Sequence, residues 1–220
     1  MFCVLAFHFK KCMNIFEILD DPRLDLSPDS TLEQIKSDLS SYLELLVKWN
    51  KRINLTSEKT ALEIIQRHIF DSLQYAKALL PNDRIIDIGS GAGFPGIPLK
   101  IIYPNLNTTL VESQRKRCSF LDAVVCKLNL KKIMVINDRA EKISPNFIVD
   151  VVLLRAVSDI NGCLKLATRF LENGGKVILK KDPEEKTDHL FSEFSLIEER
   201  VVFGYNNRQS NLLVFKKCFT

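Results

Sequence analysis

The sequence predicts an α/β fold in which a mostly parallel sheet follows an N-terminal helical segment and ends in an antiparallel C-terminal hairpin. With 220 residues, 46% of them hydrophobic, the chain can bury one substantial core. From residue 84 onward, short apolar strands alternate with helical stretches, at the spacing of right-handed βαβ units. The first of these strands runs directly into a glycine-rich turn, a common ligand site in such sheets.

The N-terminal third is predicted to be helical. Residues 30–50 carry apolar side chains at spacings of three and four, which is typical of an amphipathic helix. Ser30 and Glu33 are expected to form a capping box at its start. Two shorter helices are expected at residues 58–66 and 69–79, before a Pro-Asn-Asp sequence interrupts the chain.

Three segments are expected along the chain. Residues 1–13 are apolar and then basic, unlike the rest of the chain, so we expect an extension that is disordered or not translated, with Met13 as the start. Residues 14–82 are expected to form a helical accessory segment. Residues 83–220 are expected to form the cofactor-binding domain.

The strand and helix predictions for the second part rest on apolar runs bounded by turn residues. Strands are predicted at 85–88, 108–111, 133–136, 151–154 and 176–180, and helices at 113–128 and 160–171. Gly174 and Gly175 are expected to form the turn into the fifth strand. Strands at 196–203 and 211–217 have no room for a helix between them, so they predict an antiparallel hairpin and a sheet of seven strands.

The turn after the first strand indicates the cofactor. It contains Gly89, Gly91 and Gly93, three of the eight glycines in the chain, and matches both D-x-G-x-G-x-G and the dinucleotide pattern G-x-G-x-x-G. Asp87 would repel a pyrophosphate but favours the ammonium and sulfonium of S-adenosylmethionine (SAM). Glu112, about 20 residues further on, suits the ribose of either cofactor. SAM is therefore favoured, and an NAD-dependent oxidoreductase stays the alternative.

Composition also bears on metal sites, disulfides, membrane insertion and nucleic-acid binding. Six cysteines form no C-x-x-C pair and three histidines are widely separated, so no metal site is expected and the thiols are expected to be reduced. No apolar run reaches the ~18 residues of a membrane span, and we expect a cytoplasmic protein. The net charge of +4 is modest, although basic clusters at 48–52, 115–117, 131–132 and 180–181 are candidates for a phosphate-facing surface.

Three segments, read together, resemble one family: 49–56 (WNKRINLT), 67–73 (RHIFDSL) and 87–98 (DIGSGAGFPGIP). The chain resembles the bacterial 16S rRNA guanine-N7 methyltransferases, methyltransferase G, formerly glucose-inhibited division protein B, from about residue 42 to 181. The resemblance implies a Rossmann-like class I SAM-dependent methyltransferase fold and methylation of N7 of one guanosine in a small-subunit rRNA loop. A monomer is expected. A noncatalytic ribosome-binding factor with a vestigial SAM pocket is a further hypothesis.

Site residues are predicted from the glycine motif, from the resemblance and from position. The motif contributes Asp87, Gly91 and Gly93 to the cofactor site, and the resemblance implies Gly89, Phe94, Glu112, Ala140, Glu141 and Arg155. Candidates to position the RNA or the guanine, by residue type and place, are Arg139, Arg155, Lys180, Lys51 and Arg67. His68 is a candidate RNA-binding residue, with a packed core histidine as the alternative. The family's fifth strand usually ends in Lys-Gly, whereas Lys181 follows Lys180 here.

The chemistry implied by this resemblance requires no catalytic dyad. Guanine N7 carries a free lone pair at neutral pH, so its methylation needs no general base, and positioning is expected to supply the rate enhancement. N7 lies in the deep, narrow groove of A-form RNA, so the target base must be splayed out to be reached. An assembled ribosomal subunit is therefore expected to be a better substrate than naked RNA.

Overall fold

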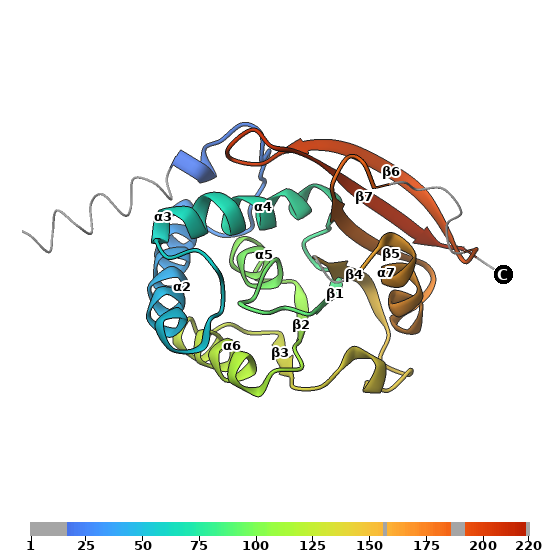
Figure 1. Cartoon of the computed structure of the whole chain (residues 1–220), viewed down its shortest axis with the longest axis horizontal. Coiled ribbons are helices and arrows are strands. Elements are labelled where there is room, and N and C mark those ends of the chain that lie inside the picture. The colour runs from blue at the N-terminus through green and yellow to red at the C-terminus, as the bar shows by residue number, and fades with distance from the viewer. Residues whose placement is uncertain (1–16, 156–157, 186–191, 219–220) are drawn as a thin grey trace, which may run out of the picture.

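The computed structural model describes residues 17–155, 158–185 and 192–218, which form a seven-stranded sheet covered by helices (Figure 1). The strand order is β3-β2-β1-β4-β5-β7-β6. The expected extension at residues 1–13, and with it the Met13 start, lies outside the described residues. The strands are β1 (Arg84–Ile88), β2 (Asn107–Val111), β3 (Ile133–Ile136), β4 (Val149–Leu154), β5 (Leu171–Lys181), β6 (Phe194–Phe203) and β7 (Gln209–Lys217).

The pairing confirms the predicted topology. Strands β1 to β5 pair in parallel, whereas β7 is antiparallel to both β5 and β6. One prediction was wrong: Gly174 and Gly175 lie within β5 and do not form a turn before it. A register shift between β4 and β5, at Val149 and Val151, accommodates the extra residues, so the strand continues instead of turning.

Alternate residues of the central strands serve two separate cores. Ile85 belongs to a hydrophobic cluster with the N-terminal helices, α5 (Gly96–Ile102) and α6 (Arg115–Lys127), whereas its neighbour Ile86 belongs to a second cluster with α7 (Ile160–Ala167). The same alternation separates Leu153 from Val152 in β4. Because successive strand side chains point to opposite faces, the sheet is buried on both sides, as a parallel sheet requires.

The helices between the strands are α5 (Gly96–Ile102), α6 (Arg115–Lys127) and α7 (Ile160–Ala167), with 3-10 turns at Ala140–Lys142 and Thr168–Phe170. Of these, α6 and α7 are close to the predicted bounds of 113–128 and 160–171. In Figure 1, α2 lies beside α6 at one end of the molecule and α7 lies by β5 at the other. Within the described residues, no helix is long and apolar enough to cross a membrane.

The N-terminal segment differs from prediction in two places. The helix α2 (Leu32–Ile53) is capped by Thr31, whose side chain accepts from the Gln34 amide at 3.3 Å, so the Ser30 cap was wrong by one residue. The two predicted shorter helices are one helical run: α3 (Ala61–Ile64), a π-helix (Ile65–Ile69), α4 (Phe70–Leu73) and a 3-10 turn (Gln74–Ala78). The π turn contains Arg67 and His68, and single π turns in helices are frequent at functional sites.

Side chains of α2 anchor the helical segment to the glycine turn and to α6. The Tyr42 hydroxyl donates to the Ala92 carbonyl at 2.6 Å, and the Trp49 ring packs edge-on against Phe120 with centroids 5.8 Å apart. Buried residues of the segment and of the sheet belong to the same hydrophobic cluster. The helical segment therefore has a fixed position over the carboxyl ends of β1 and β2, where ligands bind in open α/β sheets.

Candidate active site

The glycine turn is held by its backbone. The amides of Gly89 and Ser90 both donate to the carbonyl of Val111, at 2.9 and 3.0 Å, which ties the turn to the end of β2. All three glycines of the motif have positive φ, with Gly93 at 95°. A Cβ at Gly93 would lie 2.6 Å from Ile97, whereas one at Gly91 would meet nothing closer than 3.8 Å. The turn is thus closed toward α5 and open on its other side.

Asp87 is a fully buried carboxylate beneath this turn. Its Oδ2 accepts a hydrogen bond from the Gly96 amide at 2.9 Å, whereas its Oδ1 has no hydrogen-bond partner. Burial raises its pKa to about 7, against the lowering effect of the Gly96 amide and the Arg155 charge. A buried, half-satisfied carboxylate of this kind is stabilised by a cation placed beside it.

Glu112, at the end of β2, is also buried and accepts two backbone hydrogen bonds. Its Oε2 accepts from the Gly91 amide at 3.0 Å and its Oε1 accepts from the Gln114 amide at 2.8 Å. The Arg117 guanidinium lies 3.8 Å from Oε2. Glu112 therefore connects the glycine turn to the start of α6 and keeps acceptor capacity for hydroxyl donors.

Phe94, the last residue of the turn before Pro95, is where the helical segment meets the sheet. The His68 ring stacks on it with centroids 4.9 Å apart, the Arg155 guanidinium lies 5.2 Å from its centroid, and Tyr42 contacts its edge. Arg155 follows β4, His68 comes from the π turn and Tyr42 from α2. Segments distant in the sequence thus converge on one ring.

The hydrogen bonds of His68 fix its protonation state. Arg155 Nη2 lies 2.7 Å from Nδ1, and since a guanidinium can only donate, Nδ1 must accept. The proton is therefore on Nε2, which lies 2.6 Å from a carboxylate oxygen of Glu58. Burial and the neighbouring Arg155 charge lower the pKa of His68, against the raising effect of Glu58, so the imidazole is neutral at pH 7.

Glu58 belongs to this cluster, although it is not among the residues predicted from the sequence. Its carboxylate accepts from Thr56, from His68 and from Arg67, whose Nη1 lies 2.8 Å away. Burial would raise its pKa, but the hydrogen bonds from Thr56 and His68 outweigh that effect and hold it at about 2. It lies in the loop directly after segment 49–56, which carries part of the family resemblance, and this position was the one indication in the sequence that Glu58 lies near the site. Its burial depends on the fold and is invisible in the sequence.

A cavity of 1240 Å³ opens beside this cluster, between the helical segment and the ends of β5 to β7. His68 and Arg155, which both contact Phe94, line the cavity, and so does Lys180. Lys180 forms a 2.7 Å ion pair with Asp71 and is largely buried, and burial lowers its pKa. The cavity carries acidic and basic side chains alike, so it can offer both acceptors and donors to a polar heterocycle.

Comparison with known proteins identifies the family. Residues 35–209 match the model of the family described as rRNA small subunit methyltransferase G. The chain belongs to this family. Ribosomal RNA small subunit methyltransferase G of Mesoplasma florum is 39% identical over 81% of this chain and 76% of its own length. The same enzyme of Streptococcus pneumoniae is 34% identical over 90% and 87%.

Solved structures with the same fold include more distant proteins. A substituted form of MtNAS, crystallised in complex with S-adenosylmethionine, has a TM-score of 0.59 and 16% identity, covering 96% of this chain and 98% of that one. TrmN of Thermus thermophilus has a TM-score of 0.53 and 20% identity, covering 76% and 53%. These matches confirm the predicted Rossmann-like methyltransferase fold.

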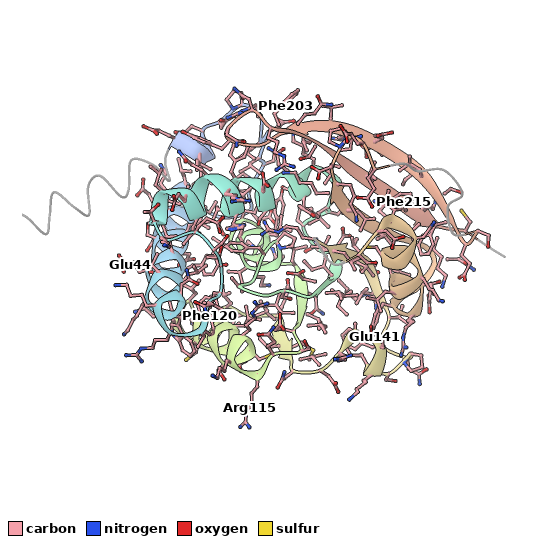
Figure 2. All side chains as sticks on the ribbon, viewed as in Figure 1. Glu44, Arg115, Phe120, Glu141, Phe203 and Phe215 are labelled. Carbon is pink, nitrogen blue, oxygen red and sulfur yellow. The ribbon has the colours of Figure 1, made fainter. Side chains whose placement is uncertain are left out.

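The structure brings some of the predicted site residues of this methyltransferase G family member together and leaves others apart. Asp87, the three glycines of the turn, Phe94, Glu112, His68 and Arg155 form one connected group around the turn. Ala140 is buried and Glu141 exposed, in the 3-10 turn that follows β3 (Figure 2). Arg139 is exposed and does not line the cavity. Lys51 lines a separate groove, away from Lys180.

The residues present fit SAM. The unpartnered Oδ1 of Asp87 is an acceptor for a cationic group, the open side of Gly91 leaves room for a ligand against the backbone, and Glu112 can accept from ribose hydroxyls. Within the described residues, no group of three or more His, Cys, Asp or Glu side chains is placed to hold a metal ion.

Proposed function

We propose that this protein transfers the methyl group of SAM to N7 of a guanosine in 16S rRNA of the small ribosomal subunit. The observation that carries the proposal is the match to methyltransferase G over residues 35–209, because it includes the glycine turn, the π turn and Arg155. The buried Asp87 with a free oxygen, at the base of the turn, gives the physical reason for a cationic cofactor.

The chain's own residues bind and orient the two substrates. Asp87, the glycine turn and Glu112 hold the cofactor, with Ala140 and Glu141 beside its adenine. SAM, when bound, supplies an electrophilic methyl group. The target guanine occupies the cavity beside Phe94, where His68 and Arg155 form the wall. Guanine N7 needs no base to remove a proton, so these side chains act by position and charge.

Arg155 is the residue we assign to the meeting point of cofactor and base. Its guanidinium is held on one side by the Phe94 ring and on the other by His68 Nδ1, which leaves N–H groups free to donate. Glu58 and His68 are positioning residues, because they act through Arg155. Lys180, held by Asp71, supplies positive charge in the lining of the cavity, and Arg67 and Arg139 are candidates for phosphate contacts.

The enzyme is a cytoplasmic monomer that needs no metal.

Its substrate is the assembled small ribosomal subunit. A base buried in A-form RNA cannot reach the cavity wall, so the target must be splayed out by the structure of the particle. Equal turnover on naked 16S rRNA and on 30S subunits would contradict this part of the proposal.

Family membership disfavours the NAD-dependent oxidoreductase that the overlapping G-x-G-x-x-G pattern allows. The two classes separate in a simple test, because S-adenosylhomocysteine should raise the unfolding temperature and NADH should not. A noncatalytic ribosome-binding factor would bind the same ligands and subunits, so only turnover excludes it.

Methyl transfer tests the proposal directly. Purified protein is incubated with radiolabelled SAM and 30S subunits from a strain that lacks the modification, and the rRNA nucleosides are then separated. The expected result is label in 7-methylguanosine. Absence of label, with SAM binding demonstrated and with subunits that a known methyltransferase G modifies, would overturn the proposed activity.

A further inference from the structure

A second groove, of 740 Å³, lies between the end of α2, the loop after it and the start of α6. Its charged lining residues are Lys51, Lys59 and Arg117, and no Asp or Glu is among the residues that line it. The active-site cavity, in contrast, includes Glu58 and Asp71 in its lining. The two spaces share His68, so the groove leads to the edge of the active site.

The loop that forms the groove is held in place by α2. The side chain of Asn50 donates to the Glu58 carbonyl at 3.0 Å and accepts from the Thr56 amide at 2.9 Å. The groove is therefore preorganised and does not depend on a ligand for its shape. Lys51 and Lys59 form no ion pair with other described residues, so both ammonium groups are available.

Helix packing unites two basic clusters that are about 60 residues apart in the sequence. Because Trp49 packs on Phe120, the end of α2 with Lys51 lies beside the start of α6 with Arg115 and Lys116. Figure 2 shows Phe120 inside the molecule and Arg115 projecting away from it. All three basic side chains are exposed, and Arg117, which follows Arg115 and Lys116 in the first turn of α6, lines the same groove as Lys51.

The placement of charge on α6 is not explained by stability. The first turn holds three basic residues, Arg115, Lys116 and Arg117, and no acidic one, and the N-cap Gln114 makes no side-chain capping bond. A helix N-terminus carries positive partial charge, so cations there are unfavourable. Lys51, in the last turn of α2, has a position that the helix dipole favours. The same arrangement that costs α6 stability makes its start attractive to anions.

We propose that this groove and the adjoining first turn of α6, together the α2–α6 basic surface, bind the phosphate backbone of the rRNA strand that carries the target nucleotide. Its chemistry is a group of basic side chains of which, among the described residues, only Arg117 has an acidic partner, Glu112 at 3.8 Å, and such a group suits phosphates and carries no base specificity. The target base then lies on the other side of His68, in the active-site cavity. This inference rests on the proposed function, because it names how the same substrate is held.

The test uses the double variant Arg115→Glu/Lys116→Glu, assayed for methylation of 30S subunits and for S-adenosylhomocysteine binding. We expect KM for subunits to rise roughly tenfold and the salt dependence of subunit binding to weaken by about two counterions, with cofactor affinity unchanged. Because the new carboxylates suit a helix N-terminus, the unfolding temperature should stay equal or rise, which separates lost contacts from misfolding. Lys127→Glu/Lys131→Glu is the matched control, with the same charge change at and beyond the other end of α6.

Two results would overturn the inference: an unchanged KM, or an equal rise in the control. If the double variant bound subunits more weakly but bound naked 16S rRNA as well as the wild type does, the inference would also be overturned. That result would indicate that this surface contacts a ribosomal protein. Subunit binding is measured without SAM as well. If the wild type bound subunits with the expected salt dependence but transferred no methyl group, the proposed function would fail while this surface assignment stood.

Discussion

The glycine turn and the His68 cluster lie on two sides of the Phe94 ring, yet they are held by different forces. The turn is fixed by backbone hydrogen bonds to Val111 and Glu112 and by positive φ at its glycines. The cluster is fixed by side-chain charge, through Glu58, His68 and Arg155. We therefore expect the glycine turn to be sensitive to added atoms, and the His68 cluster to be sensitive to the ionisation of its side chains.

The largest effect is expected from a methyl group in the turn. Gly93→Ala places a Cβ 2.6 Å from Ile97 at a φ of 95°, so we expect methylation to fall by at least about a hundredfold and S-adenosylhomocysteine binding to be lost. Gly174→Ala is the matched control, because this glycine has a similar φ of 88°, lies in β5 away from the turn, and its Cβ would meet nothing closer than 3.9 Å, so the change costs only about 1 kcal/mol of backbone strain. Calorimetric titration measures S-adenosylhomocysteine binding to both variants, and methylation is measured on 30S subunits. Similar losses in the two variants would refute the steric account.

Asp87→Asn removes the buried charge while keeping its shape. We expect cofactor affinity to drop by about tenfold or more, since a charge-assisted contact becomes neutral. The same substitution should raise the stability of the ligand-free protein. Burial raises the pKa of Asp87 to about 7. The stability that the protonated Asp87 contributes to the wild type is therefore fully present below its ordinary pKa near 4 and is lost as the pH rises to about 7.

Thermal unfolding at pH 5.5 and pH 8 checks this sign without the cofactor. The Asn variant should gain most over the wild type at pH 8 and least at pH 5.5. If Asp87→Asn were less stable than the wild type at pH 8, the ionised form of Asp87 would not destabilise the folded protein, which would contradict this prediction.

Glu58→Gln tests whether the His68 cluster depends on the charge of Glu58. We expect kcat to fall by roughly tenfold, because Arg155 loses the ordered histidine that holds it, while S-adenosylhomocysteine affinity changes less. Glu63→Gln is the control, since it changes an exposed carboxylate in the same cavity and glutamine can keep the capping box with Thr60. Steady-state methylation of 30S subunits measures the effect. An equal fall in both variants would remove the special role of Glu58.

The smallest effect is a pH dependence. The pKa of His68 is below its ordinary value of 6.5, because of burial and the Arg155 charge, so kcat at saturating SAM should be level from pH 8 to about 6.5 and fall below that. Protonation at Nδ1 would remove the acceptor for Arg155. His68→Gln should lower kcat but flatten the acid limb. An identical acid limb in the variant would assign it to another group.

The two regions also differ in how far the sequence predicted them. The glycine turn, β1 and Glu112 obey local rules of φ and strand periodicity, so the sequence predicted that Asp87 and these neighbours lie together, as they do in the structure. Glu58 was missed, because a carboxylate in a loop becomes buried only when α2 and the π turn close around it. The π turn itself was read as a break between two helices, since its extra residue disturbs the 3.6 periodicity.

The most direct test of the account is nucleoside and fragment mass analysis of 16S rRNA after the wild-type protein and SAM have acted on unmodified 30S subunits. We expect one new 7-methylguanosine in a single loop fragment, and about tenfold less of it with Asp87→Asn when the SAM concentration is below the Kd of that variant. Methylation at another guanine atom, on another base, or at many positions would contradict it.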